Sequence, residues 1–348
     1  MSTGRRSRLS TDLAPVASWA GPRGHAAQVL LTHLRPALGP ILDRQLNVVS
    51  RGQLLTAGVN DMTMYRRVRA GTWQRLLPGI YLLVPAPVGT EQRRIAAALY
   101  AGPAAQLTGV NALHWYGFRY APITDKIHVL VPHAMRCRSS AFVVMQRTMA
   151  MDQNERHAEL YRLTSPARAV VDTCRALTEL RDVRAIVTEA VHRGHASPQA
   201  LDAEIRRAAR SRTALVRLAL TEIFAGIRSA PEAELRELTG RSSVLPLILW
   251  NTQLTTLDGR PLPTPDGWMP DVGLALEVDS AEHHSGTDEW RRTLERHNEL
   301  SQYGVAVLHF TPTEIRRVPR DVLTTIERTY LARRDVSAPV AVLTRAPA

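Results

Sequence analysis

The most regular pattern of the chain lies between residues 270 and 284. Apolar residues alternate with other residues at Val272, Leu274, Leu276 and Val278. Strict period-two alternation predicts a β-strand with one packed face and one solvated face. The predicted solvated face collects carboxylates and is followed by two histidines: Asp271, Glu277, Asp279, His283 and His284.

Carboxylates at positions i and i+2 of a strand are neighbours on one face, about 7 Å apart. One divalent cation can bridge such a pair, and Mg²⁺ prefers a few carboxylates together with water and phosphate oxygens. The pattern therefore leaves two interpretations open. The stretch is either a metal-binding strand or a half-buried strand whose solvent face is acidic.

Residues 26–88 have the pattern of a small DNA-binding domain, with Ser50 and Asn60 as the expected N-caps of two short helices. Helix, short helix, basic helix and hairpin is the order of a winged helix-turn-helix, whose second helix enters the major groove. We expect helices over 26–46, 51–57 and 61–70, and strands over 73–77 and 80–84 joined at Pro78-Gly79.

The basic residues lie where this motif would contact DNA. We predict Arg66, Arg67 and Arg69 of the second helix and Arg75 of the hairpin as DNA-binding residues. The alternative is a solvated arginine face on a small helical domain.

The rest of the chain divides into a middle region, 89–228, and a C-terminal domain, 229–335. Residues 1–25 show no periodicity and are interpreted as a disordered arm, and 336–348 as a tail. Ser229 begins the first helix of the C-terminal domain, with Glu232 completing a capping box. The middle region is expected to be mixed α/β and then helical, with helices over 91–101, 107–115 and from 165 to about 227, and strands over 127–131 and 142–146. In the C-terminal domain we expect helix, strands, helix, strand and helix.

Charge is unevenly distributed along the 348 residues, whose formal net charge is +12. Residues 1–228 hold 31 Lys and Arg against 15 Asp and Glu, whereas residues 229–348 hold 13 against 17. A basic N-terminal part indicates a polyanionic partner, and an acidic C-terminal part that contains the carboxylate strand indicates a cation. Lys126 is the only lysine.

Several classes of protein are not indicated. No stretch approaches about 20 apolar residues, so no membrane partner is expected. The N-terminus lacks a secretory signal pattern. The two cysteines, Cys137 and Cys174, fit neither a metal motif nor a disulfide framework, and a reducing cytoplasm is the expected location. Nothing in the sequence indicates an oligomeric state.

Two sets of motifs resemble known families. The first set spans about 40–85 and contains Asn47–Leu54, Tyr65–Leu76 with its Arg-x-Gly-x-Trp piece, and Pro78-Gly79-Ile80-Tyr81. It resembles the N-terminal winged-helix domain of AbiEi-type antitoxins of type IV toxin–antitoxin systems. The resemblance implies DNA binding, regulation of an operon and a cognate toxin as a further partner.

The second set covers about 229–335. It consists of Ser229-x-x-Glu232, Pro270-Asp271, Glu277-Val278-Asp279, His284, Arg296 with Leu300 and Gly304, and Val307–Phe310. It resembles the domain of unknown function 559 of the PD-(D/E)XK nuclease-like superfamily, which is similar to the very-short-patch repair endonucleases. This implies a restriction-endonuclease-like α/β domain that hydrolyses phosphodiesters with Mg²⁺ or Mn²⁺.

The second resemblance also implies roles for individual residues. Asp271 and Glu277 would hold the metal, and Asp279 would add a ligand or orient water. Glu232 would reach in from its helix, His284 would act as general base or acid or steady a phosphate, and Arg296 would bind phosphate.

Relatives usually place a hairpin between their first two carboxylates, whereas Asp271 and Glu277 are six residues apart. In a straight strand they would lie about 20 Å apart, so a shared ion requires a tight bend at Val272-Gly273. Two functions stay open: a metal-dependent DNA endonuclease or nicking enzyme with its own winged helix, or a non-enzymatic DNA-binding regulator of antitoxin type with a degenerate nuclease fold. The sequence also leaves RNA open as the substrate.

Overall fold

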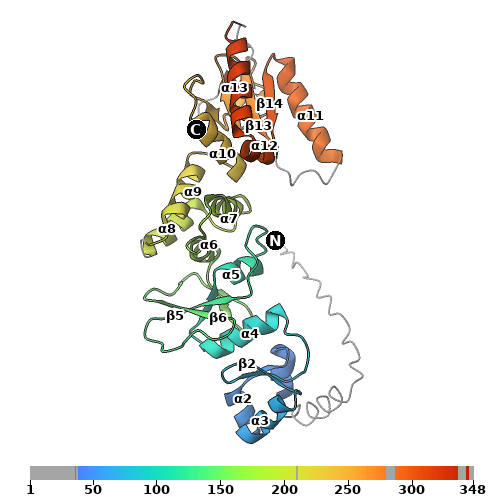
Figure 1. Cartoon of the computed structure of the whole chain (residues 1–348), viewed down its shortest axis with the longest axis vertical. Helices are drawn as coiled ribbons and strands as arrows, with labels where there is room; N and C mark the ends of the chain where they lie inside the picture. The colour runs from blue at the N-terminus through green and yellow to red at the C-terminus, as the bar shows by residue number, and fades with distance from the viewer. Residues whose placement is uncertain (1–35, 37, 209–210, 280–286, 336–341, 345–348) are drawn as a thin grey trace, which may run out of the picture. The chain divides into compact units, whose positions relative to one another are not determined.

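The computed structural model describes residues 36, 38–208, 211–279, 287–335 and 342–344 (Figure 1). The chain forms two compact units. The N-terminal unit extends to Asn111 and continues with Ile123–Ser165, and the C-terminal unit comprises Ala112–Pro122 and the chain from Pro166 onward. The division therefore falls inside the predicted middle region. The predicted arm at 1–25 lies outside the described residues.

The first part of the N-terminal unit has the predicted helices and hairpin in the predicted order, with an additional strand, residues 48–50, before the short helix. Its three-stranded sheet is antiparallel with strand order β1-β3-β2, and Trp73, Leu54 and Met64 pack in one core with Leu38 and Leu42. Ser50 and Asn60 are N-caps as predicted, because each side chain accepts a backbone N–H three residues on. The elements are a helix over 38–44, β1 (Val48–Ser50), α2 (Arg51–Thr56), α3 (Asp61–Arg69), β2 (Gln74–Leu77) and β3 (Ile80–Leu82).

The second part of this unit is a five-stranded mixed sheet with strand order β6-β5-β4-β8-β7. The predicted helix over 107–115 is wrong in its first turn, where residues 106–108 form β4. This segment pairs with β5 and β8 and is fully buried, so long-range pairing overrides local helical pattern. The elements are α4 (Thr90–Ala101), β4 (Gln106–Thr108), β5 (Ile127–Pro132), β6 (Val143–Thr148), β7 (Arg156–His157) and β8 (Arg162–Leu163).

The C-terminal unit begins with helices and ends with an α/β layer structure. Helices α6–α9 pack on one another, and the following sheet has strand order β14-β13-β12-β9 with β14 parallel to β13. Its helices are α5 (Val110–Trp115, shared with the other unit), α6 (Pro166–Cys174), α7 (Leu180–His192), α8 (Pro198–Arg207), α9 (Ala214–Phe224), α10 (Ala230–Thr239), α11 (Thr287–Gln302), α12 (Pro312–Arg317) and α13 (Pro319–Arg333). Its strands are β9 (Leu249–Trp250), β10 (Leu254–Thr256), β11 (Pro261–Leu262), β12 (Gly267–Met269), β13 (Leu274–Val278), β14 (Ala306–Phe310) and β15 (Val342–Thr344).

Strand β13 is covered on both faces. Leu274 and Leu276 pack against α10, α12 and α13, whereas Ala275 belongs to a second core with Leu300 of α11 and Leu254 of the small sheet β11-β10-β15. The predicted apolar face is confirmed, but the prediction that the other face is solvated is wrong for Ala275, which is fully buried. Only the end of the strand, at Glu277 and Val278, is half-buried. No helix among the described residues is long and apolar enough to cross a membrane.

Candidate nucleic-acid interface and candidate carboxylate site

One face of helix α3 packs in the domain core, and the opposite face is exposed to solvent. Met64 lies in the core, and Asp61 at the helix start is ion-paired with Arg51 of α2. Positions i, i+3, i+4 and i+7 of a helix share one face. The exposed stripe of α3 at this spacing consists of Met62, Tyr65, Arg66 and Arg69.

The four predicted DNA-binding arginines are not all brought together. Arg66 and Arg69 lie in the exposed stripe, and Arg75 is exposed on β2 of the hairpin. Arg67 is half-buried and lies about 100° around the helix from Arg66. Its carbonyl accepts hydrogen bonds from Thr72, so this residue closes the helix-to-hairpin connection.

The hairpin is tied to the helices through its turn. Gly79 has φ +74°, a left-handed conformation that glycine adopts without strain. Its carbonyl accepts the backbone N–H of Arg51 at 2.7 Å. The hairpin and the start of α2 are therefore held together, which positions Arg75 and α3 within one small domain.

A cluster of carboxylates lies at one end of β12 and β13 in the C-terminal unit. Gly267 pairs with Leu276 in the antiparallel hairpin, so Asp266 comes opposite Glu277. The Oδ2 atom of Asp266 accepts the backbone N–H of Val278 at 2.8 Å. Glu277 pairs in turn with His309 of the parallel strand β14.

Glu232 joins this cluster from α10 and is 1% exposed. Its carboxylate accepts hydrogen bonds from the backbone N–H of Arg228 at 2.8 Å and from the side chain of Asn251. Ser229 caps the helix as predicted, but the Glu232 side chain does not return to the cap residue. It contacts Asn251, which directly follows β9, instead.

The environment favours the neutral forms of these acids. Burial raises the pKa of Glu232 to about 7, with the charge of Asp266 adding to the effect. Burial likewise raises the pKa of Glu277 to about 7, again with a contribution from Asp266, and burial raises the pKa of Asp266. Buried like charges disfavour joint ionisation, so these three groups are electrostatically coupled.

Basic side chains border the cluster. Arg296 of α11 pairs with Glu277, with 3.3 Å between Nη2 and Oε1. His309 Nδ1 lies 3.3 Å from Asp279 Oδ2, and this contact raises the pKa of His309. The buried Nε2 atom of His309 has no hydrogen-bond partner among the described residues. His309 was absent from the predicted site, and the pairing of β13 with β14 reveals its position.

Asp271 does not belong to the cluster, so its prediction as a site residue is corrected. It lies in the turn at the far end of the β12–β13 hairpin, where it accepts a hydrogen bond from Tyr330 at 2.8 Å. The expected bend at Val272-Gly273 closes the hairpin and leads Asp271 away from Glu277. Sequence reasoning missed Asp266, although Pro265-Asp266 is a second Pro-Asp pair with room for a hairpin before Glu277. His284 lies outside the described residues.

The cluster does not form a metal cage in this arrangement. Among the described residues, no three His, Cys, Asp or Glu side chains are grouped so that they could hold one ion. Protein groups already occupy the carboxylates, as Arg296 does for Glu277. To bind the predicted Mg²⁺ or Mn²⁺, these carboxylates would have to give up their contacts with protein groups such as Arg296.

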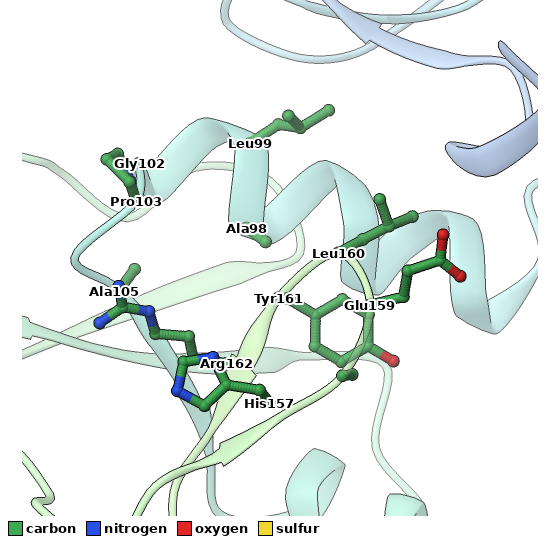
Figure 2. A pocket seen from close by; sticks show the side chains of 11 residues that line it. Ala98, Leu99, Gly102, Pro103, Ala105, His157, Glu159, Leu160, Tyr161 and Arg162 are labelled. Carbon is green, nitrogen blue, oxygen red and sulfur yellow. The ribbon is translucent and has the colours of Figure 1, made fainter. Parts of the chain in front are cut away.

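A separate hollow of about 410 Å³ lies in the N-terminal unit between the end of α4 and the β7–β8 hairpin (Figure 2). His157 and Arg162 lie next to each other on its wall (Figure 2), and both contact Glu155, at 3.0 and 3.2 Å. Tyr161 donates a hydrogen bond to Glu91 at 2.6 Å. Glu155 is paired with Arg162 and offsets its charge, so the hollow has no marked preference for an anion.

Comparison with known proteins supports the first resemblance. Residues 40–84 match the family model described as transcriptional regulator, AbiEi antitoxin. This match confirms the predicted AbiEi-type domain in that segment and supports a DNA-binding regulatory role for it. No curated protein matches the chain.

A search of solved structures finds the crystal structure of the RV2827C protein from Mycobacterium tuberculosis. The similarity covers 63% of this chain and 88% of that chain, with 15% identity and a TM-score of 0.38. The resemblance of residues 229–335 to the domain of unknown function 559 stays a prediction.

Proposed function

We propose that this protein is a DNA-binding transcriptional regulator of the AbiEi antitoxin type. The observation that carries the proposal is the exposed stripe of α3, with Arg66 and Arg69, beside a hairpin that presents Arg75. These features lie within the segment that matches the AbiEi regulator family. In a winged helix-turn-helix, the second helix occupies the major groove and the hairpin follows the phosphate backbone.

Electrostatics supports the same conclusion. The only acidic residue of α3, Asp61, is ion-paired with Arg51, which leaves the exposed stripe without a negative charge. Arginines that neutralise phosphates release counterions from DNA, so binding weakens steeply with salt. A regulator of this kind binds its own upstream DNA without a metal.

The test is a binding titration of the full-length protein with the DNA upstream of its own gene. Affinity is measured between about 50 and 200 mM NaCl, and each phosphate contact that is lost should reduce the log–log salt slope by about 1. Arg66→Ala/Arg69→Ala should weaken binding and flatten the slope. Arg136→Ala/Arg138→Ala removes the same charge from exposed positions elsewhere in the unit and serves as the matched control. Equal losses in both variants would refute a role for α3.

The antitoxin description also suggests a cognate toxin as a second partner. We infer that toxin control and DNA binding are separable. Growth arrest caused by a reading frame adjacent to the gene should be relieved by the intact protein. Relief by the Arg66→Ala/Arg69→Ala variant as well would separate neutralisation from operator binding, whereas no relief by the intact protein would contradict a toxin partner.

A second candidate function is metal-dependent cleavage of DNA. It is favoured by the position of Asp266 opposite Glu277 with Glu232 and Asp279 nearby, because nucleases of this class use carboxylates around one or two cations. We propose Asp266, Glu277, Asp279 and Glu232 as the residues of that site.

Nicking of supercoiled plasmid, with Mg²⁺, with Mn²⁺ and with a chelator, tests this candidate. Metal-dependent nicking that is lost in Asp266→Asn and retained in Asp271→Asn would support it. These variants replace one acid by its neutral isostere at the two ends of the same hairpin. Absence of nicking on plasmid and on the upstream DNA, by protein that still binds the latter, would count against the nuclease and leave the regulator in place.

A further inference from the structure

The exposed stripe of α3 is not uniformly basic. Its N-terminal part holds two large apolar side chains, since Met62 is 56% exposed and Tyr65 is 59% exposed. Its C-terminal part holds Arg66 and Arg69. Phosphate contacts are made by charged groups and by N–H and O–H donors. Met62 has none of these, so its exposure indicates a surface suited to more than phosphate.

The length of the stripe limits what it can contact. Met62 and Arg69 are seven residues apart, which corresponds to about 10 Å along a helix. Base pairs are stacked about 3.4 Å apart, so a helix lying along the groove would face about four of them. The apolar and basic halves of the stripe would then meet adjacent base pairs.

The major groove contains one apolar group at the base edges, the C5-methyl group of thymine, while guanine offers two acceptors that suit arginine. We infer that Met62 and Tyr65 contact thymine methyl groups and that Arg66 and Arg69 contact neighbouring guanines or phosphates. This inference rests on the proposed DNA-binding function. It specifies the preferred site as a short element that contains thymine.

The test removes only the methyl groups from the DNA. A random-sequence duplex library is first enriched on the full-length protein, and the selected duplex is then made with deoxyuridine in place of thymidine. Deoxyuridine keeps every hydrogen-bonding group of thymidine. Loss of each contacted methyl group should lower the affinity about fourfold, the value expected for one buried methyl-sized group.

Protein variants assign the effect to the stripe. In Met62→Ala/Tyr65→Ala, thymidine and deoxyuridine duplexes should bind equally, because the apolar contacts are gone. Both positions are exposed and alanine is a strong helix former, so α3 should remain folded. Met149→Ala removes a methionine outside the helix that is even more exposed, at 86%, and should keep the preference for thymidine.

The outcomes are distinct. A thymidine preference in the intact protein and in Met149→Ala, but not in the double variant, supports the inference. Tight binding with equal affinity for both duplexes, an enriched element without thymine, or a preference that persists in the double variant would each overturn it and leave the DNA-binding function intact. Failure to bind any duplex would overturn the proposed function as well.

Discussion

Replacing Glu277 by glutamine should stabilise the C-terminal unit at high pH. The carboxylate is mostly buried, with a side chain 13% exposed, and burial together with Asp266 raises its pKa to about 7. The native state therefore binds more protons than the unfolded chain between about pH 4.5 and 7. Stability is greatest below this range and is lost as the pH rises through it.

The magnitude follows from the same values. Each tenfold change in an acid constant corresponds to about 1.4 kcal/mol. The rise of the pKa from 4.5 to about 7 therefore limits the cost of ionising Glu277 to about 3 kcal/mol at pH 8. Because Glu232 and Asp266 share this cost, we expect a gain of about 1–3 kcal/mol in the Glu277→Gln variant. The attraction of Arg296, whose side chain is 51% exposed, already lowers the pKa and is too weak to reverse the sign.

Amide hydrogen exchange of peptides covering β13 and β14 measures the local free energy of opening. It is compared between variant and wild type with chelator present, at about pH 4 and about pH 8. The variant should gain protection at the higher pH, and the difference should vanish at the lower pH, where wild-type Glu277 is already protonated.

Glu299→Gln is the control, because Glu299 is also paired with an arginine, Arg260, but its side chain is 30% exposed. It should change the free energy of opening by less than about 1 kcal/mol. A loss of protection in Glu277→Gln at the higher pH would refute the reasoning, since it would mean that the ionised carboxylate stabilises the strand.

Three further predictions concern stability. Ser50→Ala removes the N-cap of α2 and should lower the free energy of unfolding of the N-terminal unit by about 1 kcal/mol in urea denaturation. Gly79→Ala forces alanine into a left-handed backbone and should cost about 1–2 kcal/mol in the same assay, whereas Gly52→Ala, inside α2, should not destabilise. The N–H groups of Arg119 and Tyr120 donate to the buried carboxylate of Glu189. Glu189→Gln should lower the free energy of local opening at these two amides by about 1–3 kcal/mol, measured as faster hydrogen exchange. Unchanged exchange would contradict this.

The sequence determined those features that depend on neighbouring residues. The caps at Ser50 and Asn60, the hairpin at Pro78-Gly79 and the apolar face of β13 were predicted because a cap, a turn and an alternating strand involve residues within a few positions of each other. The motifs of residues 40–84 likewise form one contiguous segment, which the family match confirms.

The tertiary structure alone decided the composition of the carboxylate site. Asp266 and not Asp271 lies opposite Glu277 because the register of the β12–β13 hairpin sets the pairing. His309 joins the carboxylate site because β14 pairs in parallel with β13, although α11 separates the two strands in the sequence. Strand β13 is covered on both faces because α11 and a small sheet pack on Ala275. Asp266 had one signal in the sequence, its Pro-Asp pair before a possible hairpin. The contacts of His309 and Ala275 join residues distant in sequence, so no periodicity or spacing could indicate them, and strand pairing and core packing decide them.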